Sequence, residues 1–429
     1  MVLTGFLGMA QNFDRAKLDH YFNVLEVNDR FMGSVAVSKG GEIIYSRALG
    51  HADIDAQLKA DPQTKYRIGS ISKTFTAVLA LKAVEANVLD LNQKLGEFFP
   101  RVPNADKISI RHLLSHRSGI HNFTDEPVYM TYNTRAKTQE EMISIIVEGG
   151  SDFEPDGRMA YSNSNYVLLT FILEKVFDKP FARILEDEII APLGLGSTYM
   201  GGAIDSGNKE SRSYRFLTHW TLEPETDLSI PLGAGGVVST PTDLVTFSDA
   251  LFGGKLIGEE SLVEMMTLRD NFGLGLFQIP FYDKAGYGHT GGIDGFTSVF
   301  SHFDDGAVSY ALLSNGTNFN NNNISLAVLS AVYDKPYEVP SFGDFQVDPE
   351  LLQQYVGTYS TDQIPMTLTI STENGTLLAQ GSGQPSFALE AAEKNRLEYD
   401  PAGVVIEFNP EENTLTLKQF GSEFLFKKD

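Results

Sequence analysis

Cysteine is absent from the 429-residue sequence. Disulfides, cysteine-ligated metal sites and a thiol nucleophile are therefore excluded, and cysteine usage says nothing about the compartment. Beyond the first residues there is no apolar run long enough to span a bilayer. Basic residues are few: 33 Lys and Arg stand against 56 Asp and Glu, which gives a formal net charge of −23. This acidity argues against binding to nucleic acid or to anionic membranes.

The first ten residues are apolar except for Thr4. Gly8 and Ala10 place small residues three and one positions before Gln11, as at the cleavage site of a secretory signal peptide. We therefore interpret residues 1–10 as a signal-peptide remnant and expect a periplasmic or secreted protein. The run is short and has no basic start, so a cytoplasmic protein with an N-terminal tail is the alternative.

The chain is long enough for two domains, and its 42% hydrophobic content is ordinary for a globular protein. An amphipathic helix over 13–27 precedes two strands, 33–38 and 42–50, which a turn containing two glycines joins. Many helical segments follow before the chain returns to strands near 287–314. This order predicts a mixed sheet with helices packed on it.

A segment containing Pro and Gly, 336–347, is typical of a linker. Beyond it, short alternating strands run to the C-terminus, with an Asn374-Gly375 hairpin signal among them. Such a succession of about eight strands predicts a small up-and-down antiparallel barrel. We therefore divide the chain into the remnant at 1–10, a main domain at 11–335, the linker at 336–347 and a barrel domain at 348–429.

Ser70 and Lys73 lie at the start of an apolar, proline-free helix that runs to about Glu85. A serine at a helix start commonly caps free N–H groups. Lys73 lies one turn further along the same face, and burial can lower the pKa of a lysine until it accepts a serine proton. A cap and a nucleophile are equal alternatives for Ser70 on these residues alone. A second Ser-x-x-Lys, Ser206 to Lys209, lies in a loop that would not hold this geometry.

His112 and His116 are four residues apart, a spacing that could bind a metal on one helix face. No glutamate lies between them as in an H-E-x-x-H site, and Gly119 follows. Two histidines that close a helix before a glycine are the favoured interpretation. We expect neither a metal site nor a cofactor.

Three motifs occur in a fixed order: Ser70-x-x-Lys73, Tyr161-x-Asn163 and His289-Thr290-Gly291. This order resembles the signature of the serine β-lactamase and penicillin-binding-protein superfamily. Stretches 112–120 and 235–240 also resemble segments of its class C β-lactamase, DD-carboxypeptidase, D-aminopeptidase and esterase branch. The resemblance implies an α+β fold, an antiparallel sheet flanked by helices with an all-helical subdomain. The C-terminal strands resemble the lipocalin-like barrel of certain D-aminopeptidases.

The resemblance also implies roles for the motif residues. Ser70 would attack an acyl carbon, while Lys73 and Tyr161 share the proton transfers. The N–H groups of Ser70 and Gly292 would hold the oxyanion. Contacts with the substrate are implied for the remaining motif residues: Asn163, His289, Thr290 and Gly291.

His289 departs from the β-lactamase pattern, which carries lysine at this position. A lysine is a permanent positive charge for a substrate carboxylate, whereas a histidine is mostly neutral near pH 7. We therefore favour a serine hydrolase that forms an acyl-enzyme with small peptide or amide substrates, of D-aminopeptidase or DD-carboxypeptidase type. A carboxylesterase with weak or no β-lactamase activity is the alternative, and a non-catalytic binding protein is a third. The oligomeric state stays open.

Overall fold

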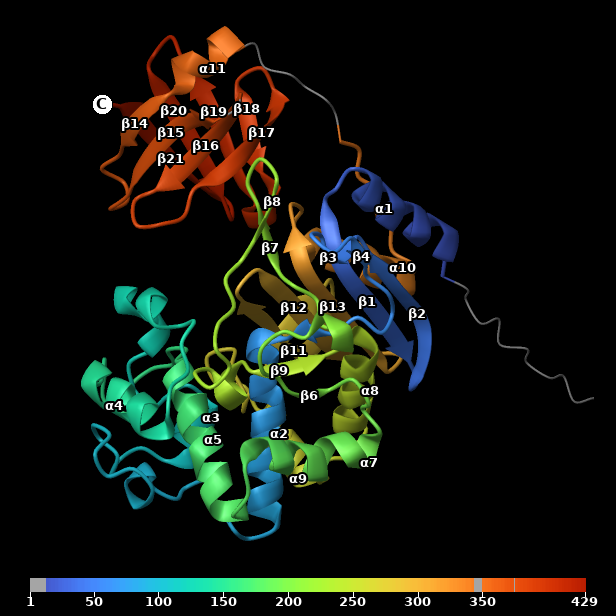
Figure 1. The fold of residues 1–429 in the computed structure, drawn as a ribbon, viewed down its shortest axis with the longest axis vertical. Helices are drawn as coiled ribbons and strands as arrows, with labels where there is room; N and C mark the ends of the chain where they lie inside the picture. The colour runs from blue at the N-terminus through green and yellow to red at the C-terminus, as the bar shows by residue number, and fades with distance from the viewer. Residues whose placement is uncertain (1–12, 343–348, 374) are drawn as a thin grey trace, which may run out of the picture. The chain divides into compact units, whose positions relative to one another are not determined.

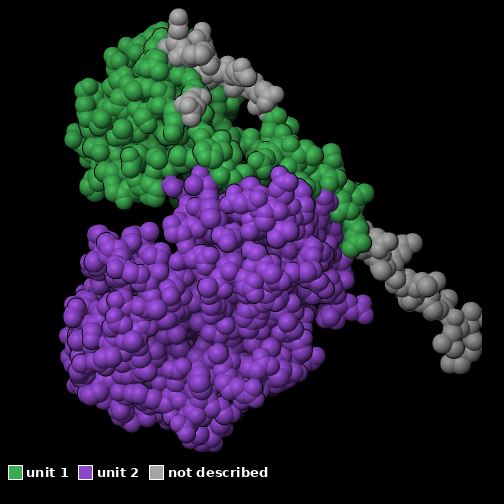
Figure 2. Space-filling model, viewed as in Figure 1, with its two compact units in different colours: residues 1–31, 216–220, 317–429 green, residues 32–215, 221–316 purple. Residues whose placement is uncertain are grey.

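The computed structural model describes residues 13–342, 349–373 and 375–429. The predicted signal-peptide remnant lies outside these residues, as does part of the predicted linker. The chain forms two compact units (Figure 2). One comprises residues 32–215 and 221–316, and the other combines the N-terminal residues up to 31 with 216–220 and 317–429. The domain boundaries drawn from the sequence remain a prediction.

The central sheet has six strands in the order β10-β11-β12-β13-β1-β2 (Figure 1). Its strands are β1 (Phe31–Lys39), β2 (Glu42–Leu49), β10 (Phe277–Phe281), β11 (Lys284–Ile293), β12 (Phe296–Phe303) and β13 (Val308–Thr317). The pairs β1–β2, β10–β11, β11–β12 and β12–β13 are antiparallel. The late strands therefore return to the first hairpin to complete the sheet, as the sequence predicts.

Between β2 and β10, seven shorter strands lie outside this sheet: β3 (His51–Asp53), β4 (Leu58–Lys59), β5 (Tyr66–Arg67), β6 (Tyr199–Met200), β7 (Tyr214–Phe216), β8 (Trp220–Leu222) and β9 (Val237–Ser239). Strands β5, β9 and β6 form a small sheet of their own. β5 pairs with β9 through Arg67 and Val238, and its chain continues directly into Ser70. The position of Ser70 is thus fixed from its N-terminal side by a strand.

The helices are α1 (Arg15–Val27), α2 (Ser72–Glu85), α3 (Ile110–Leu114), α4 (Gln139–Gly149), α5 (Asn163–Phe177), α6 (Phe181–Leu185), α7 (Ala191–Leu193), α8 (Pro241–Phe252), α9 (Glu259–Met266), α10 (Asn321–Val332) and α11 (Pro349–Tyr355). Most of α2 is buried, and it packs against α5. Its Phe75 ring stacks on Phe247 of α8 with the ring centroids 3.8 Å apart. A helix enclosed on all sides gives Ser70 and Lys73 a rigid support.

The C-terminal strands form a closed barrel of eight strands, which confirms the predicted barrel. They are β14 (Gly357–Ser360), β15 (Thr367–Glu373), β16 (Thr376–Gly381), β17 (Phe387–Glu393), β18 (Arg396–Tyr399), β19 (Val404–Asn409), β20 (Thr414–Gln419) and β21 (Ser422–Lys428). Each strand pairs with its neighbour in the chain, and β14 pairs with β21 to close the ring. Closure leaves no free sheet edge in this barrel. Its interior is filled by alternating apolar side chains such as Leu368 and Ile370.

One helix begins earlier than its sequence predicts. The polar residues 156–166 favour a loop, because Ser and Asn prefer turns, and the apolar pattern predicts a helix only over 167–176. In the structure α5 begins at Asn163. The Asn163 backbone N–H donates to Asn122 Oδ1 at 2.9 Å, and Ser164 Oγ donates to the His121 carbonyl at 2.6 Å. Bonds to a loop some forty residues earlier thus extend the helix by one turn.

Candidate active site

Ser70 lies in a short 3-10 turn, Gly69–Ile71, at the head of α2. Its side chain does not cap that turn, so the capping alternative is not what the structure shows. Gly69 has a φ of +51°, and a Cβ there would lie 2.8 Å from the backbone N of Gly292. A Cβ on Gly291 would lie 2.1 Å from the Ile68 carbonyl oxygen. Glycine at both positions lets the serine segment and β11 touch backbone to backbone.

Lys73 is fully buried beneath Ser70. Its Nζ lies 3.0 Å from Ser70 Oγ, 2.7 Å from Asn163 Oδ1 and 2.7 Å from the Ala234 carbonyl oxygen. The Asn163 and Ala234 oxygens can only accept hydrogen bonds. A neutral amine satisfies both with its two hydrogens, and its lone pair then points to the remaining neighbour, the serine hydroxyl. The geometry suits a base that receives the Ser70 proton.

Burial holds the pKa of the Lys73 ammonium group well below its ordinary value. The described residues place no carboxylate in hydrogen-bond contact with Nζ that would reverse this effect. Desolvation disfavours the charged form, so burial shifts Lys73 toward its neutral, basic form. The lowered pKa and the hydrogen-bond geometry therefore both favour Lys73 as the base that receives the Ser70 proton.

Tyr161 and Asn163 reach the same lysine from the segment that opens α5. The ring of Tyr161 lies 4.8 Å from Lys73 Nζ, and its hydroxyl shares a hydrogen bond with the Ser70 side chain. Burial raises the pKa of the Tyr161 phenol, while the bond with Ser70 acts in the opposite direction. The phenol is thus protonated near neutral pH and can pass on a proton. Asn163 uses its oxygen for Lys73, and its Nδ2 donates to Thr124 Oγ1 at 3.0 Å.

His289 lies on β11 but is buried, with 2% of its surface exposed. Its Nδ1–H donates to the Thr290 carbonyl at 2.5 Å, and its ring packs near Phe277 at a centroid distance of 5.0 Å. Burial is the main cause that lowers the pKa of His289 to about 3. The imidazole is therefore neutral over the ordinary pH range. Its neighbour Thr290 is exposed on the strand.

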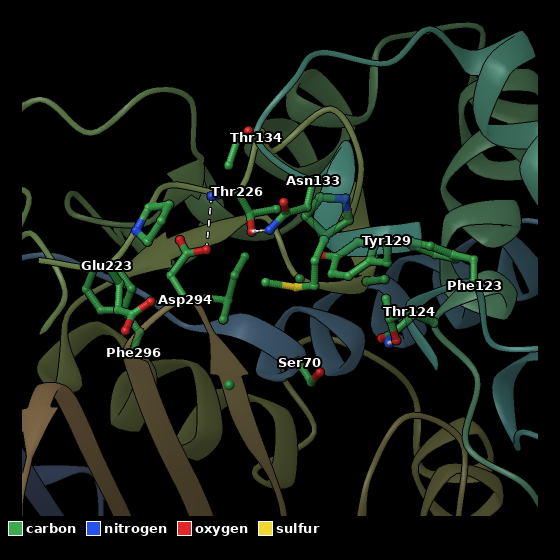
Figure 3. A pocket seen from close by; sticks show the side chains of 18 of the residues that line it. Ser70, Phe123, Thr124, Tyr129, Asn133, Thr134, Glu223, Thr226, Asp294 and Phe296 are labelled. Carbon is green, nitrogen blue, oxygen red and sulfur yellow. Dashed lines mark hydrogen bonds between the residues drawn. The ribbon is translucent and has the colours of Figure 1, made fainter. Parts of the chain in front are cut away.

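A cavity of about 570 Å³ opens over Ser70. Its walls include Ser70, Asn163, Ala234, Gly235 and Gly292, the group nearest the motif residues. The rest of the lining combines apolar, polar and acidic residues: Phe123, Thr124, Tyr129, Met130, Asn133, Thr134, Glu223, Pro224, Thr226, Pro231, Ile293, Asp294, Phe296 and Thr297. Figure 3 shows Glu223 and Asp294 on one side of the cavity and Tyr129 and Phe123 on the other, with Ser70 between them.

The structure thus brings Ser70, Lys73, Tyr161 and Asn163 together, with Gly292 on the facing strand. The remaining motif residues, His289, Thr290 and Gly291, belong to the same strand but are not part of the cavity wall. Their contacts with a substrate remain a prediction.

Two residues that contact the motif residues were given no role in the site from the sequence, although His116 belongs to the stretch 112–120 that resembles the family. Thr124 lines the cavity and accepts the Asn163 amide, and His116 packs its ring on Tyr161. His116 lies beyond the end of α3 with a φ of +55°, so it does not share a helix face with His112. Among the described residues, no group of three or more potential metal ligands occurs. Within those same ranges, no helix is both long and apolar enough to cross a membrane.

Known proteins are similar to this chain over most of its length. A family model described as Beta-lactamase matches residues 26–334. The chain is 26% identical to penicillin-binding protein 4* of Bacillus subtilis (strain 168), over 97% of this chain and 98% of that protein. It is also 26% identical to a teichoic acid D-alanine hydrolase of Staphylococcus aureus (strain MRSA252), over 53% of this chain and 55% of that protein.

A solved structure shares the fold of the larger part of the chain. The D-amino acid amidase from Ochrobactrum anthropi SV3, complexed with L-phenylalanine amide, is 26% identical and has a TM-score of 0.65. The match covers 74% of this chain and 99% of the amidase. The family resemblance drawn from the three motifs is confirmed. This chain belongs to the β-lactamase family and is a serine hydrolase.

Proposed function

We propose that the protein hydrolyses small peptide or amide substrates through an acyl-enzyme on Ser70, with a D-residue on the acyl side. The observation that carries the proposal is the arrangement around Lys73 Nζ, which has two obligate acceptors and the Ser70 hydroxyl 3.0 Å away. A neutral lysine so placed can take the serine proton as Ser70 attacks the acyl carbon.

The remaining steps follow from the neighbouring groups. The N–H groups of Ser70 and Gly292 would stabilise the negative oxygen of the tetrahedral intermediate. Tyr161, whose raised pKa keeps its phenol protonated, would pass a proton to the leaving amine. The Lys73 ammonium would return its proton to the Tyr161 phenolate, and a water molecule would then attack the acyl-enzyme with the neutral lysine as base.

The electrostatics of the site support an amide substrate over a β-lactam. His289 stands where a lysine would bind a substrate carboxylate, and its lowered pKa leaves it uncharged. None of the described residues that line the cavity is Lys or Arg. A substrate carboxylate therefore has no fixed positive charge in the cavity wall. The relatives named as a D-alanine hydrolase and a D-amino acid amidase agree with this choice.

Rates on four substrate types test the proposal: D-amino-acid amides, D-Ala-D-Ala peptides, nitrocefin and short p-nitrophenyl esters. We expect the highest kcat/KM on a D-amino-acid amide, which has no carboxylate to bind, and the lowest on nitrocefin. Ser70→Ala should remove all turnover and all labelling by a fluorophosphonate while leaving the circular dichroism spectrum unchanged. Turnover retained in Ser70→Ala would refute the mechanism.

A carboxylesterase is the second candidate. The apolar cavity residues Phe123, Tyr129 and Met130 would accept the acyl chain of a simple ester. An ester also depends less than an amide on protonation of its leaving group. Turnover of the p-nitrophenyl esters with none of the D-amides or D-peptides would establish this alternative.

We also propose that the protein acts outside the cytoplasm. The apolar residues 1–10, with Gly8 and Ala10 before Gln11, support export. Mass spectrometry of the mature N-terminus from cell fractions tests this, and an intact Met1 in the cytoplasmic fraction would refute it.

A further inference from the structure

A buried ion pair joins Arg67 to Asp294. Arg67 Nη1 lies 2.9 Å from Asp294 Oδ2, and the two side chains are 3% and 2% exposed. Asp294 lies at the cavity wall, whereas Arg67 lies behind it on β5. The sequence motifs do not include either residue.

The pair is extended by the backbone of one cavity residue. Arg67 Nη1 donates to the Thr226 carbonyl at 2.8 Å, and the Thr226 N–H donates to Asp294 Oδ1 at 2.9 Å (Figure 3). Arg67 Nη2 also donates to the Gly202 carbonyl at 2.9 Å. Both carboxylate oxygens of Asp294 are thus satisfied, and each partner is held by more than one bond.

The place of the pair in the chain gives it a mechanical role. Arg67 precedes Ser70 by three residues, and Asp294 follows Gly292 by two. These are the two segments whose N–H groups would form the oxyanion hole. Between them, Ser298 Oγ donates to the Ile68 carbonyl at 2.8 Å. The ion pair therefore ties together both halves of that hole.

The pair also has an electrostatic role. A lone carboxylate at position 294 would place a negative charge in the wall of the cavity where a negative oxygen must form. In a site of low dielectric constant, such a charge opposes the transition state strongly. The Arg67 guanidinium compensates the carboxylate locally. Loss of Arg67 should therefore be more harmful than loss of the Asp294 charge.

We propose that Arg67 and Asp294 are positioning residues for the oxyanion hole, an inference that rests on the proposed function. They act by setting the distance between the Ser70 and Gly292 N–H groups and by keeping the hole free of uncompensated negative charge. Buried ion pairs contribute little to stability compared with apolar residues of the same shape, so a geometric role accounts for this one better.

The test compares Asp294→Asn and Arg67→Gln with the full-length wild type on its best substrate. We expect kcat to fall about 10-fold in Asp294→Asn and about 100-fold in Arg67→Gln, with KM changed less than about twofold, because misplacement acts on the transition state. Affinity for a boronic acid, which forms a tetrahedral adduct on Ser70, should fall in the same order.

Asp53→Asn is the matched control. Asp53 Oδ2 pairs with Arg212 Nε at 3.1 Å, its side chain is 7% exposed, and it is not in the cavity wall. This variant should lower Tm but leave kcat and boronate affinity unchanged. If Asp294→Asn and Arg67→Gln behave as the control does, the inference is wrong.

Two further outcomes are distinguishable. If Arg67→Gln does not fold, Arg67→Lys keeps the charge without the planar fork, and it should show an intermediate loss of kcat. If the wild type neither turns over substrate nor binds the boronic acid, the proposed function itself is wrong, and the inference that rests on it falls with it.

Discussion

The imidazole ring of His116 lies against the phenol ring of Tyr161, with their centroids 4.3 Å apart. The His116 ring Nδ1 accepts the Ser162 N–H at 3.1 Å, and its carbonyl accepts the Ala160 N–H at 2.9 Å. One residue thus holds the chain on both sides of the tyrosine as well as its ring. We infer that His116 sets the direction in which the phenol points.

Replacing His116 by asparagine tests this relationship. Asparagine tolerates the φ of +55° and can offer Oδ1 to Ser162, so the fold should persist while the ring contact is lost. We expect kcat to fall about 5- to 10-fold with KM nearly unchanged. The measurement is repeated in a Tyr161→Phe background, where the further loss should vanish. An equal loss in both backgrounds would contradict the inference.

The lowered pKa of Lys73 predicts an acid limb in the pH profile. Below this pKa the amine is protonated and cannot accept the Ser70 proton, so kcat/KM should rise with pH and then level. Because burial lowers the pKa, the plateau should begin well below the pH at which a free lysine loses its proton. Rates between pH 4 and 10 give the profile, and a curve that still climbs at pH 10 would count against Lys73 as the base. Lys73→Arg, always charged, should be inactive.

Thr124 should be needed to orient Asn163. Thr124→Val removes the acceptor for Asn163 Nδ2 at nearly constant shape. The lost hydrogen bond is worth about 1 kcal/mol, which corresponds to roughly a fivefold lower kcat/KM. Thr124→Ser keeps the hydroxyl and should retain most of the wild-type rate. A wild-type rate in the valine variant together with a loss in the serine variant would assign the effect to the methyl group instead.

An ion-pair cluster near the site should make stability depend on pH. His121 Nδ1 lies 2.9 Å from Asp152 Oδ1, and Nε2 lies 3.2 Å from Glu126 Oε1. The hydrogen bond with Asp152 is the main cause that raises the pKa of His121. A raised pKa means that the folded state binds the proton more tightly. The stabilisation that protonated His121 gives the folded state is therefore complete below the unfolded pKa of about 6.5. It is lost as the pH rises through the pKa of His121 in the folded state.

His121→Asn should therefore lower Tm more at pH 5.5 than at pH 8.5. The expected difference in the free energy of unfolding is about 1 kcal/mol or less, since the cluster is partly solvated. Asp152→Asn should show the same pattern, because it removes the main partner. Thermal unfolding at both pH values gives the comparison, and equal shifts would exclude a role for the protonated histidine.

The parts of the fold that could be predicted are those with local patterns. Alternating residues such as Leu368 and Ile370 indicated the barrel strands, and apolar spacing indicated α2. Ser70 and Lys73 could be paired because three residues span about one helical turn. In each case the interacting residues lie close together in the sequence.

The residues that could not be predicted act over long separations. Arg67 and Asp294 are 227 positions apart, and His116 meets Ser162 across 46 positions. Nothing in the sequence around any of these four residues indicates its partner. The burial of His289 was likewise not foreseen, because strand alternation alone does not say which face of β11 is covered by other elements.

The cavity and the reacting groups come from different kinds of structure. Ser70, Lys73 and Gly292 belong to α2, its leading turn and β11, whereas much of the outer wall comes from connections such as 123–134 and 223–226. Apart from Thr124, which orients Asn163, side chains in those connections can change in size or charge without moving the serine, its base or the facing strand. The protein can therefore acquire a new acyl preference by a few substitutions in its loops, and a search for altered specificity should begin at Tyr129 and Met130.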